Sequence, residues 1–405
     1  MNSRTLPWSP WLCLLLPILL SACADAAPAA DDRLYLLRYA AHLHPESGSA
    51  GITLTLSQPR ALLRELDFNA PAEFYTDFGG DGELRRDANR LLWRPPAKGG
   101  TLTYRVKVDR LRDAAYVERL AGRWAIFRLG HLFPPARARA LADSRAEADV
   151  RLTGPEGWTV ETPFGPGSRA VHRIPSARRF PRPTGWAVAG ELGVRRDVIS
   201  GRRVAVAAPV GEGFRRQDIL AFLRWTLPGL IGVFPSFPER LLIVGSGRCM
   251  WRGGLSGPRS LYLHPARPLI SENGTSTLLH ELVHVAMASA PGRSDDWLVE
   301  GLAEYYSLEI LRRTGGISSK RFEQALNTLS GWADRQGAGL ANPSTGADTA
   351  FAVLKLHGLA EELSRRGESL DAVVTELLAA DRLTGAGLEQ ALAARGIPNR
   401  SGDLP

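Results

Sequence analysis

Cysteine is scarce in this chain, with only Cys13, Cys23 and Cys249 among 405 residues. Cys13 lies within an apolar N-terminal run and Cys23 directly after it, which leaves Cys249 alone in the body of the protein. An intramolecular disulfide is therefore excluded there. A chain of this length can bury a large core without such a bridge. Because no histidine adjoins Cys249, we expect a small buried thiol rather than a nucleophile.

The N-terminal apolar run, residues 12–20, is too short to cross a bilayer as a helix, which takes about 20 residues. It follows the positive charge of Arg4 and ends in small residues, a pattern typical of a secretory signal. The segment Leu-Ser-Ala-Cys at 20–23 resembles a bacterial lipoprotein signal, in which the cysteine becomes the lipidated first residue. The alternative is a plain secretory peptide cut near Ala26 or Ala27.

The lipoprotein pattern predicts where the protein resides. We expect residues 1–22 to be the signal peptide, Cys23 the lipidation site and residues 23–31 a short tether. Ala24 stands where an aspartate would resemble an inner-membrane retention signal. The predicted location is therefore the bacterial cell envelope, anchored in the outer membrane and facing the periplasm.

Clusters of basic and aromatic residues are also missing. The formal net charge is +8, but the arginines occur only in short groups such as Arg178-Arg179 and Arg202-Arg203. We therefore expect no nucleic-acid partner and interpret the excess charge as a solvated basic surface. The hydrophobic fraction of 44% and the charged fraction of 23% are ordinary for a folded globular protein.

The first half of the mature chain has the period-two pattern of strands. Alternating segments occur at 34–39, 52–56, 102–108, 150–152 and 158–160, separated by turns rich in glycine and proline. Strands at such short intervals predict a β-sandwich over residues 32–200.

After residue 200 the pattern becomes mixed. Strands are expected at 204–207, 241–244 and 260–263, and helices at 213–230, 275–290 and 296–312. Residues 319–395 are predicted to be mostly helical. The chain therefore divides into a β-rich domain, an α+β domain at 201–312 and a helical subdomain at 313–405.

The segment His280-Glu281-Leu282-Val283-His284 carries the chemistry. Apolar neighbours give it helical periodicity, and positions i and i+4 lie on one face of a helix. Both imidazoles can therefore bind one metal ion, while Glu281 reaches the attacking water. Ser276 or Thr275 is expected to cap the helix.

A catalytic zinc ion needs a third protein ligand and an open position for water. Downstream, the frame Trp-Leu-x-Glu-Gly-x-Ala-x-Tyr at 297–305 resembles the second helix of the gluzincin peptidases. That group includes thermolysin, aminopeptidase N and the glycyl aminopeptidases, and the last two are the most similar. The resemblance implies that Glu300 is the third ligand of one Zn²⁺ ion and that Glu304 orients the first histidine.

Two alternatives for the third ligand can be weighed. Fifteen residues separate His284 from Glu300, a shorter gap than in thermolysin, and thermolysin's gap would select Glu304. We prefer Glu300 because the surrounding frame is more specific than a loop length. The metzincin pattern fails, since its third histidine would fall at Ala290.

Two further site elements follow only from the resemblance. Gly253 and Gly254 resemble the strand that binds substrate backbone in aminopeptidase-type gluzincins, although a simple glycine turn is the alternative. Ser256 occupies the position of the acidic residue that holds the substrate amine, which leaves an endopeptidase open. No tyrosine follows Tyr306, so His357 becomes the candidate oxyanion donor, the alternative being an ordinary histidine on a helix face.

Together, the resemblance implies an α+β multidomain protein with an N-terminal β-sandwich, a thermolysin-like zinc-binding domain and a C-terminal helical subdomain. The implied activity is hydrolysis of peptide bonds in a peptide or protein substrate, with Glu281 as general base. Two alternatives remain, namely hydrolysis of a non-peptide amide and an inactive binding or scaffold lipoprotein with the same fold.

Overall fold

The computed structural model describes residues 31–167, 170–175, 178–287 and 295–397. The predicted signal peptide, the lipidation site Cys23 and most of the predicted tether lie outside the described residues. Residues 33–405 form one compact unit.

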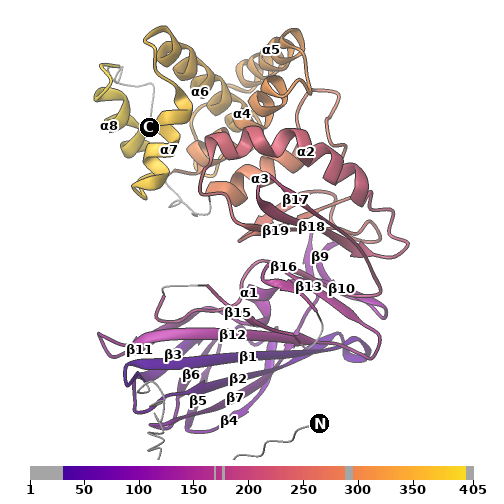
Figure 1. Cartoon of the computed structure of the whole chain (residues 1–405), viewed down its shortest axis with the longest axis vertical. Coiled ribbons are helices and arrows are strands. Elements are labelled where there is room, and N and C mark those ends of the chain that lie inside the picture. Colours follow the sequence, from indigo (N-terminus) through magenta and orange to yellow (C-terminus); the bar gives the residue numbers. More distant parts are fainter. Residues whose placement is uncertain (1–30, 168–169, 176–177, 288–294, 398–405) are drawn as a thin grey trace, which may run out of the picture. The chain divides into compact units, whose positions relative to one another are not determined.

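The first part of this unit consists of β-sheets, as predicted (Figure 1). The first sheet has six strands in the order β15 (Val171–Arg173), β12 (Arg145–Thr153), β1 (Leu34–His44), β2 (Ser49–Ser57), β7 (Gly99–Lys107) and β4 (Tyr75–Gly80). The second has the order β14 (Gly165–Pro166), β13 (Thr159–Thr162), β16 (Trp186–Gly190), β10 (Trp124–Arg128), β9 (Ala115–Leu120) and β8 (Arg110–Arg112). The third has the order β11 (Ala136–Ala140), β3 (Leu63–Asn69), β6 (Arg90–Arg94) and β5 (Glu83–Asp87). A short 3₁₀ helix, η1 (Pro45–Ser47), joins β1 to β2, and α1 (Leu129–Leu132) follows β10.

A fourth, mixed sheet begins the α+β part. Its order is β17 (Leu192–Ile199), β18 (Arg202–Pro209), β19 (Arg240–Val244), β21 (Ser260–Leu263) and β20 (Gly254–Gly257). The strands β18, β19 and β21 run parallel, whereas β17 and β20 are antiparallel to their neighbours. The three strands expected after residue 200 are therefore confirmed as β18, β19 and β21, and β20 is an edge strand.

The central strands β18, β19 and β21 of this fourth sheet are buried on both faces because their residues alternate between two cores. Val204 and Val206 of β18 join the core formed with the helices. Ala205 and Ala207 face the other way and join a core with Trp124 and other residues of β10 and β16. Period-two alternation on β18 thus packs the second sheet against one face of the fourth sheet and the helices against the other.

The helices follow the sequence prediction closely. They are α2 (Arg216–Val233), α3 (Thr277–Met287), α4 (Asp296–Arg313), α5 (Ser319–Gln336), α6 (Ala347–Arg365), α7 (Leu370–Ala379) and α8 (Gly385–Ala393). Helix α2 contacts β17 and β18 (Figure 1), and α3 contacts β20 and β21.

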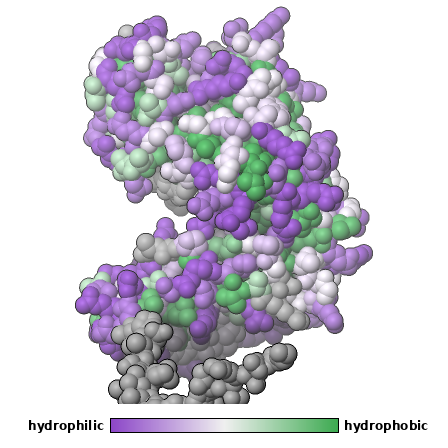
Figure 2. All heavy atoms as spheres, viewed as in Figure 1, coloured by the Kyte–Doolittle hydropathy of each residue, from purple (hydrophilic) through white to green (hydrophobic). Residues whose placement is uncertain are grey.

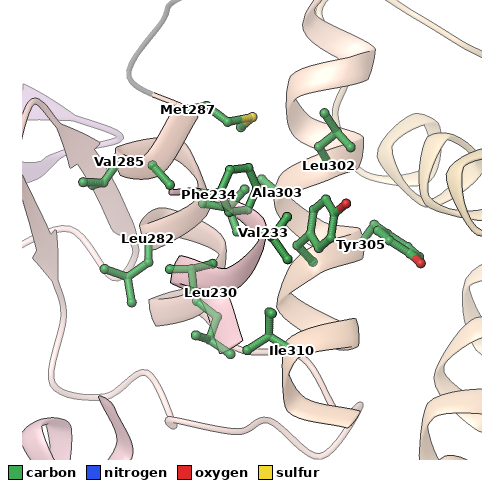
Figure 3. Packing of buried hydrophobic residues seen from close by; sticks show 14 of the residues in the cluster. Leu230, Val233, Phe234, Leu282, Val285, Met287, Leu302, Ala303, Tyr305 and Ile310 are labelled. Carbon is green, nitrogen blue, oxygen red and sulfur yellow. The ribbon is translucent and has the colours of Figure 1, made fainter. Parts of the chain in front are cut away.

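Helices α3 and α4 pack against each other through apolar side chains. Leu282 on α3 and Leu302 and Ala303 on α4 are fully buried, in a cluster that also includes Phe234 at the end of α2 (Figure 3). Burying a leucine side chain contributes about 1.5–3 kcal/mol relative to leaving it exposed. This packing fixes how α4 lies relative to α3, and with it the side chains on their polar faces.

On the molecular face shown in Figure 2, hydrophilic residues predominate and hydrophobic patches are small. Within the described ranges, no helix combines the length and apolar character needed to cross a bilayer. One expectation about the surface was wrong, because Cys249 is exposed. It lies in a turn with a left-handed φ of 61°, so its side chain does not follow the buried pattern of the preceding strand β19.

The predicted domain boundaries stay predictions. The boundary at residue 200 falls in the turn between β17 and β18, which pair over their whole length. The boundary at residue 312 falls at the end of α4, whose buried face also contacts α6.

Close packing between α4 and α6 provides a test of this arrangement. A Cβ at Gly301 would lie 2.9 Å from the Cβ of Ala352 and 3.0 Å from Cδ1 of Leu356. Gly301→Val should therefore force the two helices apart and lower the free energy of unfolding by about 1–3 kcal/mol. Urea or thermal unfolding would measure this loss.

The matched control is Gly232→Val in α2, where a Cβ would meet no atom within 4 Å. Valine and glycine differ little in helix propensity, so this variant should unfold close to the wild type. Equal stability of the two variants would contradict the packing described for Gly301.

Candidate metal centre

The His-Glu-x-x-His segment lies on α3, and a side chain caps the first turn of this helix. The hydroxyl of Ser276 accepts a hydrogen bond from the backbone N–H of Leu279 at 3.3 Å, so the predicted cap is Ser276. One turn apart, the rings of His280 and His284 have centroids 4.8 Å from each other. Their Nε2 atoms are separated by 3.1 Å. Both imidazoles therefore direct Nε2 to the same point.

Helix α4 brings a carboxylate to that point. One oxygen of Glu300 lies 3.4 Å from Nε2 of His280, and the other lies 3.4 Å from Nε2 of His284. In the described part of the chain, these three residues are the group whose ligand atoms all fall within 4.8 Å of one another. The structure thus gathers the three residues that the sequence proposed as ligands.

Glu304 lies one turn further along α4, as the sequence suggested. Its carboxylate accepts a hydrogen bond from Nδ1 of His280 at 3.0 Å. When His280 is neutral, this contact places its proton on Nδ1 and leaves the lone pair of Nε2 free, which is the tautomer that a metal ligand needs. In this geometry Glu300 lies beside Nε2 of both histidines, whereas Glu304 lies beside Nδ1 of His280.

The donor set fits a zinc ion. Two imidazole nitrogens and one carboxylate are the protein ligands found in many catalytic zinc sites, where a fourth position stays open. All three side chains are only partly exposed, at 15–30%. They line a cavity of about 920 Å³. An ion held by these three residues at the cavity wall would keep its remaining side accessible to water and substrate.

Glu281 is placed beside the edge strand β20. Its side chain is only 8% exposed, and it lines the same cavity as the three candidate ligands. A Cβ at Gly254 would lie 2.7 Å from Cγ of Glu281 and 2.8 Å from Cγ2 of Thr277. Glycine at position 254 therefore lets the strand approach the helix closely and keeps room for the Glu281 carboxylate.

Charge coupling within the site is strong. Burial works to lower the pKa of His280, but its hydrogen bonds to Glu300 and Glu304 outweigh burial and raise the pKa to about 10. Burial works to raise the pKa of Glu300, but its contacts with His280 and His284 outweigh it and lower the pKa to about 2. In the metal-free protein His280 is therefore protonated at neutral pH, and its charge lies between the carboxylates of Glu300 and Glu304.

The two glycines proposed to bind substrate are placed differently. Gly254 lines the cavity, and Leu255, Ser256 and Gly257 continue along it. Gly253 is instead confined by the ring of Trp251, since a Cβ there would lie 1.8 Å from Cζ3 of Trp251. Gly253 thus accommodates a tryptophan, and only Gly254 of the pair remains a candidate for contact with substrate.

His357 does not join the site. It lies on α6 and lines a separate hollow, where it contacts the ring of Phe322 and pairs with Glu361 at 3.6 Å. We therefore do not retain it as an oxyanion donor. No tyrosine is among the described residues that line the cavity, whereas the hydroxyl residues Thr345 and Thr349 do line it.

Sequence reasoning missed three other residues of this cavity. Arg112 and Arg128 reach it from the second sheet, and Trp332 from α5. No spacing relates them to the His-Glu-x-x-His motif, because they come from other elements of the chain. The only signal available was that Arg128 ends an otherwise apolar strand, Trp-Ala-Ile-Phe-Arg.

Similarity to known proteins is found in the structure and not in the sequence. No model of a protein family matches the sequence, and no curated protein matches it. Among solved structures, an aminopeptidase N family protein from Idiomarina loihiensis has a TM-score of 0.66 at 16% identity. The match covers 85% of this chain and 70% of that protein.

Two further structures have the same architecture. An M1 zinc metallopeptidase from Deinococcus radiodurans matches with a TM-score of 0.56 at 15% identity, covering 91% of each chain. Yeast leukotriene A4 hydrolase in complex with bestatin matches with a TM-score of 0.55 at 14% identity, covering 96% of this chain and 71% of that protein. This chain therefore has the fold of the aminopeptidase N type of zinc metallopeptidases, which confirms the predicted gluzincin fold.

The charge coupling predicts a pH dependence of zinc binding. Zinc needs neutral imidazoles, so at pH 8 it must displace the proton that His280 carries below its pKa of about 10. Between pH 7 and 9, affinity should rise about tenfold per pH unit, with about one proton released per ion. Calorimetry in two buffers of different ionisation enthalpy would count that proton.

Glu304→Gln is the informative comparison, because it removes one of the carboxylates that raise the pKa of His280. Proton release at pH 8 should then fall, and zinc affinity should drop about 10–100-fold. In the metal-free wild type, protonated His280 contributes to the free energy of unfolding. This contribution is fully present below pH 6.5 and is lost as the pH rises through about 10. Identical proton counts in both proteins would contradict the assigned role of Glu304.

Proposed function

We propose that this protein is a zinc-dependent peptidase. The observation that carries the proposal is the convergence of His280, His284 and Glu300, with Glu281 lining the same cavity. The fold shared with zinc metallopeptidases supports the proposal, although at 14–16% identity it does not specify a substrate.

In this proposal His280, His284 and Glu300 hold one zinc ion, which supplies Lewis acidity toward the attacking water and the scissile carbonyl. Glu304 keeps His280 in the required tautomer through their 3.0 Å hydrogen bond. Glu281 accepts the proton of the attacking water and transfers it to the leaving amine. Its position against Gly254 restricts the carboxylate to the wall of the cavity.

The edge strand β20 gives the substrate a place to bind. Among the described strands it pairs with β21 alone, so its other edge offers backbone N–H and C=O groups along the cavity wall. An extended peptide can add to such an edge as a further strand, and its main-chain hydrogen bonds then position the scissile bond. A cavity of about 920 Å³ accommodates several residues.

Two other functions use the same residues. A hydrolase of non-peptide amides would need the same zinc ion and the same base. An inactive binding lipoprotein would retain the fold without turnover. The accessible cavity beside the candidate ligands favours an enzyme, and the edge strand favours a peptide among amide substrates.

We further propose that the protein works in the bacterial cell envelope, lipid-anchored through Cys23 in the outer membrane and facing the periplasm. The support is the segment Leu20-Ser21-Ala22-Cys23 at the end of a short apolar run. Peptides or proteins of that compartment are then the substrates.

The test of the catalytic proposal is Glu281→Gln. The variant should bind one zinc ion per chain but lose about 10²–10⁴-fold in kcat/KM, because an amide cannot accept the proton of water. Digestion of an unbiased peptide library, followed by mass spectrometry, would provide the substrate and the rates.

Glu272→Gln serves as the matched control, because Glu272 is an exposed loop residue before α3. It should leave cleavage unchanged. Undiminished cleavage by the Glu281→Gln variant would remove Glu281 from its role. A zinc-loaded wild type that cleaves no peptide would favour the other two functions.

The anchor is tested by Cys23→Ala in the full chain. Lipidation requires the thiol of that residue, so the variant should incorporate no labelled fatty acid and leave the membrane fraction. Cys13→Ala, within the apolar run, should keep both properties. Fatty-acid labelling of the Cys23→Ala variant, or its unchanged recovery in membranes, would contradict the proposed anchor.

A further inference from the structure

Arg128 reaches the substrate cavity because of its place on β10. Trp124 and Ile126 on this strand belong to the core shared with the fourth sheet, whereas Ala125 and Phe127 belong to the core on the opposite side. Alternation therefore directs Arg128 to the side of the fourth sheet. At the end of the strand it lines the cavity that also contains His280 and Glu281.

The guanidinium of Arg128 is held in place by two neighbours. It lies over the ring of Trp186, which is fully buried, at 4.7 Å from the ring centroid. Its Nε is 3.9 Å from a carboxylate oxygen of Glu118, too far for a hydrogen bond. That Nε is buried and has no hydrogen-bond partner. The Arg128 side chain as a whole is 35% exposed, so the stacked guanidinium can bind an anion at little cost in side-chain entropy.

Glu118 does not neutralise this arginine fully. Its carboxylate also accepts hydrogen bonds from the backbone N–H of Arg128 and from His131, and it faces the guanidinium of Arg110. One buried carboxylate is thus shared among several groups, and this end of the cavity keeps a positive charge.

The edge strand β20 relates Arg128 to the reacting centre. At one end, a Cβ at Gly254 would meet Cγ of Glu281 at 2.7 Å. At the other end, a Cβ at Gly257 would meet Cδ1 of Trp186, the ring beneath Arg128, at 3.2 Å. Three residues of extended strand span about 10 Å, so a peptide along β20 would pass from Glu281 to Arg128 within about three residues.

The acidic groups of the cavity all lie elsewhere. Glu300 and Glu304 contact His280, and Asp296 accepts a hydrogen bond from the backbone N–H of Ser344. On β20 itself the polar side chain is that of Ser256. Nothing described at the Gly257 end would pair with a substrate amine, whereas Arg128 would repel one.

We infer that Arg128 forms a subsite for a substrate carboxylate, about three residues from the scissile bond. The inference rests on the proposed peptidase function and specifies its substrate class. The carboxylate belongs either to an Asp or Glu side chain or to the C-terminus of the peptide. An arginine–carboxylate pair forms charge-assisted, often bidentate hydrogen bonds, which an uncharged amide at the same position does not provide.

The experiment compares matched peptides on the zinc-loaded protein. Starting from one cleaved peptide, Glu, Gln or Lys is placed at each of three positions on either side of the cleaved bond. A second series compares a free C-terminus with its amide. We expect kcat/KM about tenfold higher for Glu than for Gln at one position, or for the free C-terminus over the amide, and lowest for Lys.

Arg128→Gln should reduce that ratio to nearly one, whereas Arg128→Lys should keep part of it. The matched control is Arg119→Gln, because Arg119 also lies over aromatic rings, of Tyr116 and Trp124, but lines a different hollow. It should keep the full ratio. Because the readout is a ratio between two substrates, a general loss of folding or zinc would lower both rates and leave it unchanged.

A ratio near one in the wild type, a preference for Lys, or an unchanged ratio in Arg128→Gln would overturn the subsite. If the zinc-loaded wild type cleaves no peptide, the peptidase proposal fails by itself. Calorimetric binding of the same Glu and Gln peptides then decides the subsite. Tighter binding of the Glu peptide, lost in Arg128→Gln, supports the subsite, and equal binding refutes it.

Discussion

The packing of α3 against α4 is the constraint on which the candidate site depends. Two histidines on one helix face can direct both imidazoles to one point. A metal site also needs a third donor and a fixed histidine tautomer. Both come from α4, where Glu300 and Glu304 are one turn apart and face the same histidine. Helices α3 and α4 contact each other and share one apolar core, which includes Leu282 and Leu302 (Figure 3). The chemistry of the site is therefore a consequence of an apolar interface.

A second consequence of packing concerns the substrate. The central strands of the fourth sheet are buried on both faces, one of them against the second sheet, and the side chain at the end of β10 reaches the cavity. In our proposal, the arginine in that place recognises a substrate carboxylate, a preference that the fold alone does not specify. The residue types at the reacting centre fit a hydrolase. In our proposal the residues around β20 discriminate among substrates, since Arg128 favours a carboxylate and β20 has no acidic side chain to hold an amine.

Much of the architecture could be predicted because its signals are local. The strands β18, β19 and β21 are short apolar runs between turns, and the helices α3 and α4 have apolar spacing of three and four. The three candidate ligands and Glu304 followed from two short motifs. Predictions about residues outside these motifs agree less well with the structure. Cys249 is exposed because of a left-handed turn, and His357 faces Phe322 rather than the cavity.

The sequence by itself determined that a helix would present His280, Glu281 and His284, and that a second helix would carry Glu300 and Glu304. Helical periodicity acts within a few residues, so it can be seen in the chain without a fold. Only the tertiary structure decided that Gly254 approaches Glu281, that Trp251 occupies the space beside Gly253, and that Arg128 enters the cavity. These are contacts between residues far apart in sequence, set by how sheets and helices stack, and no local pattern encodes them.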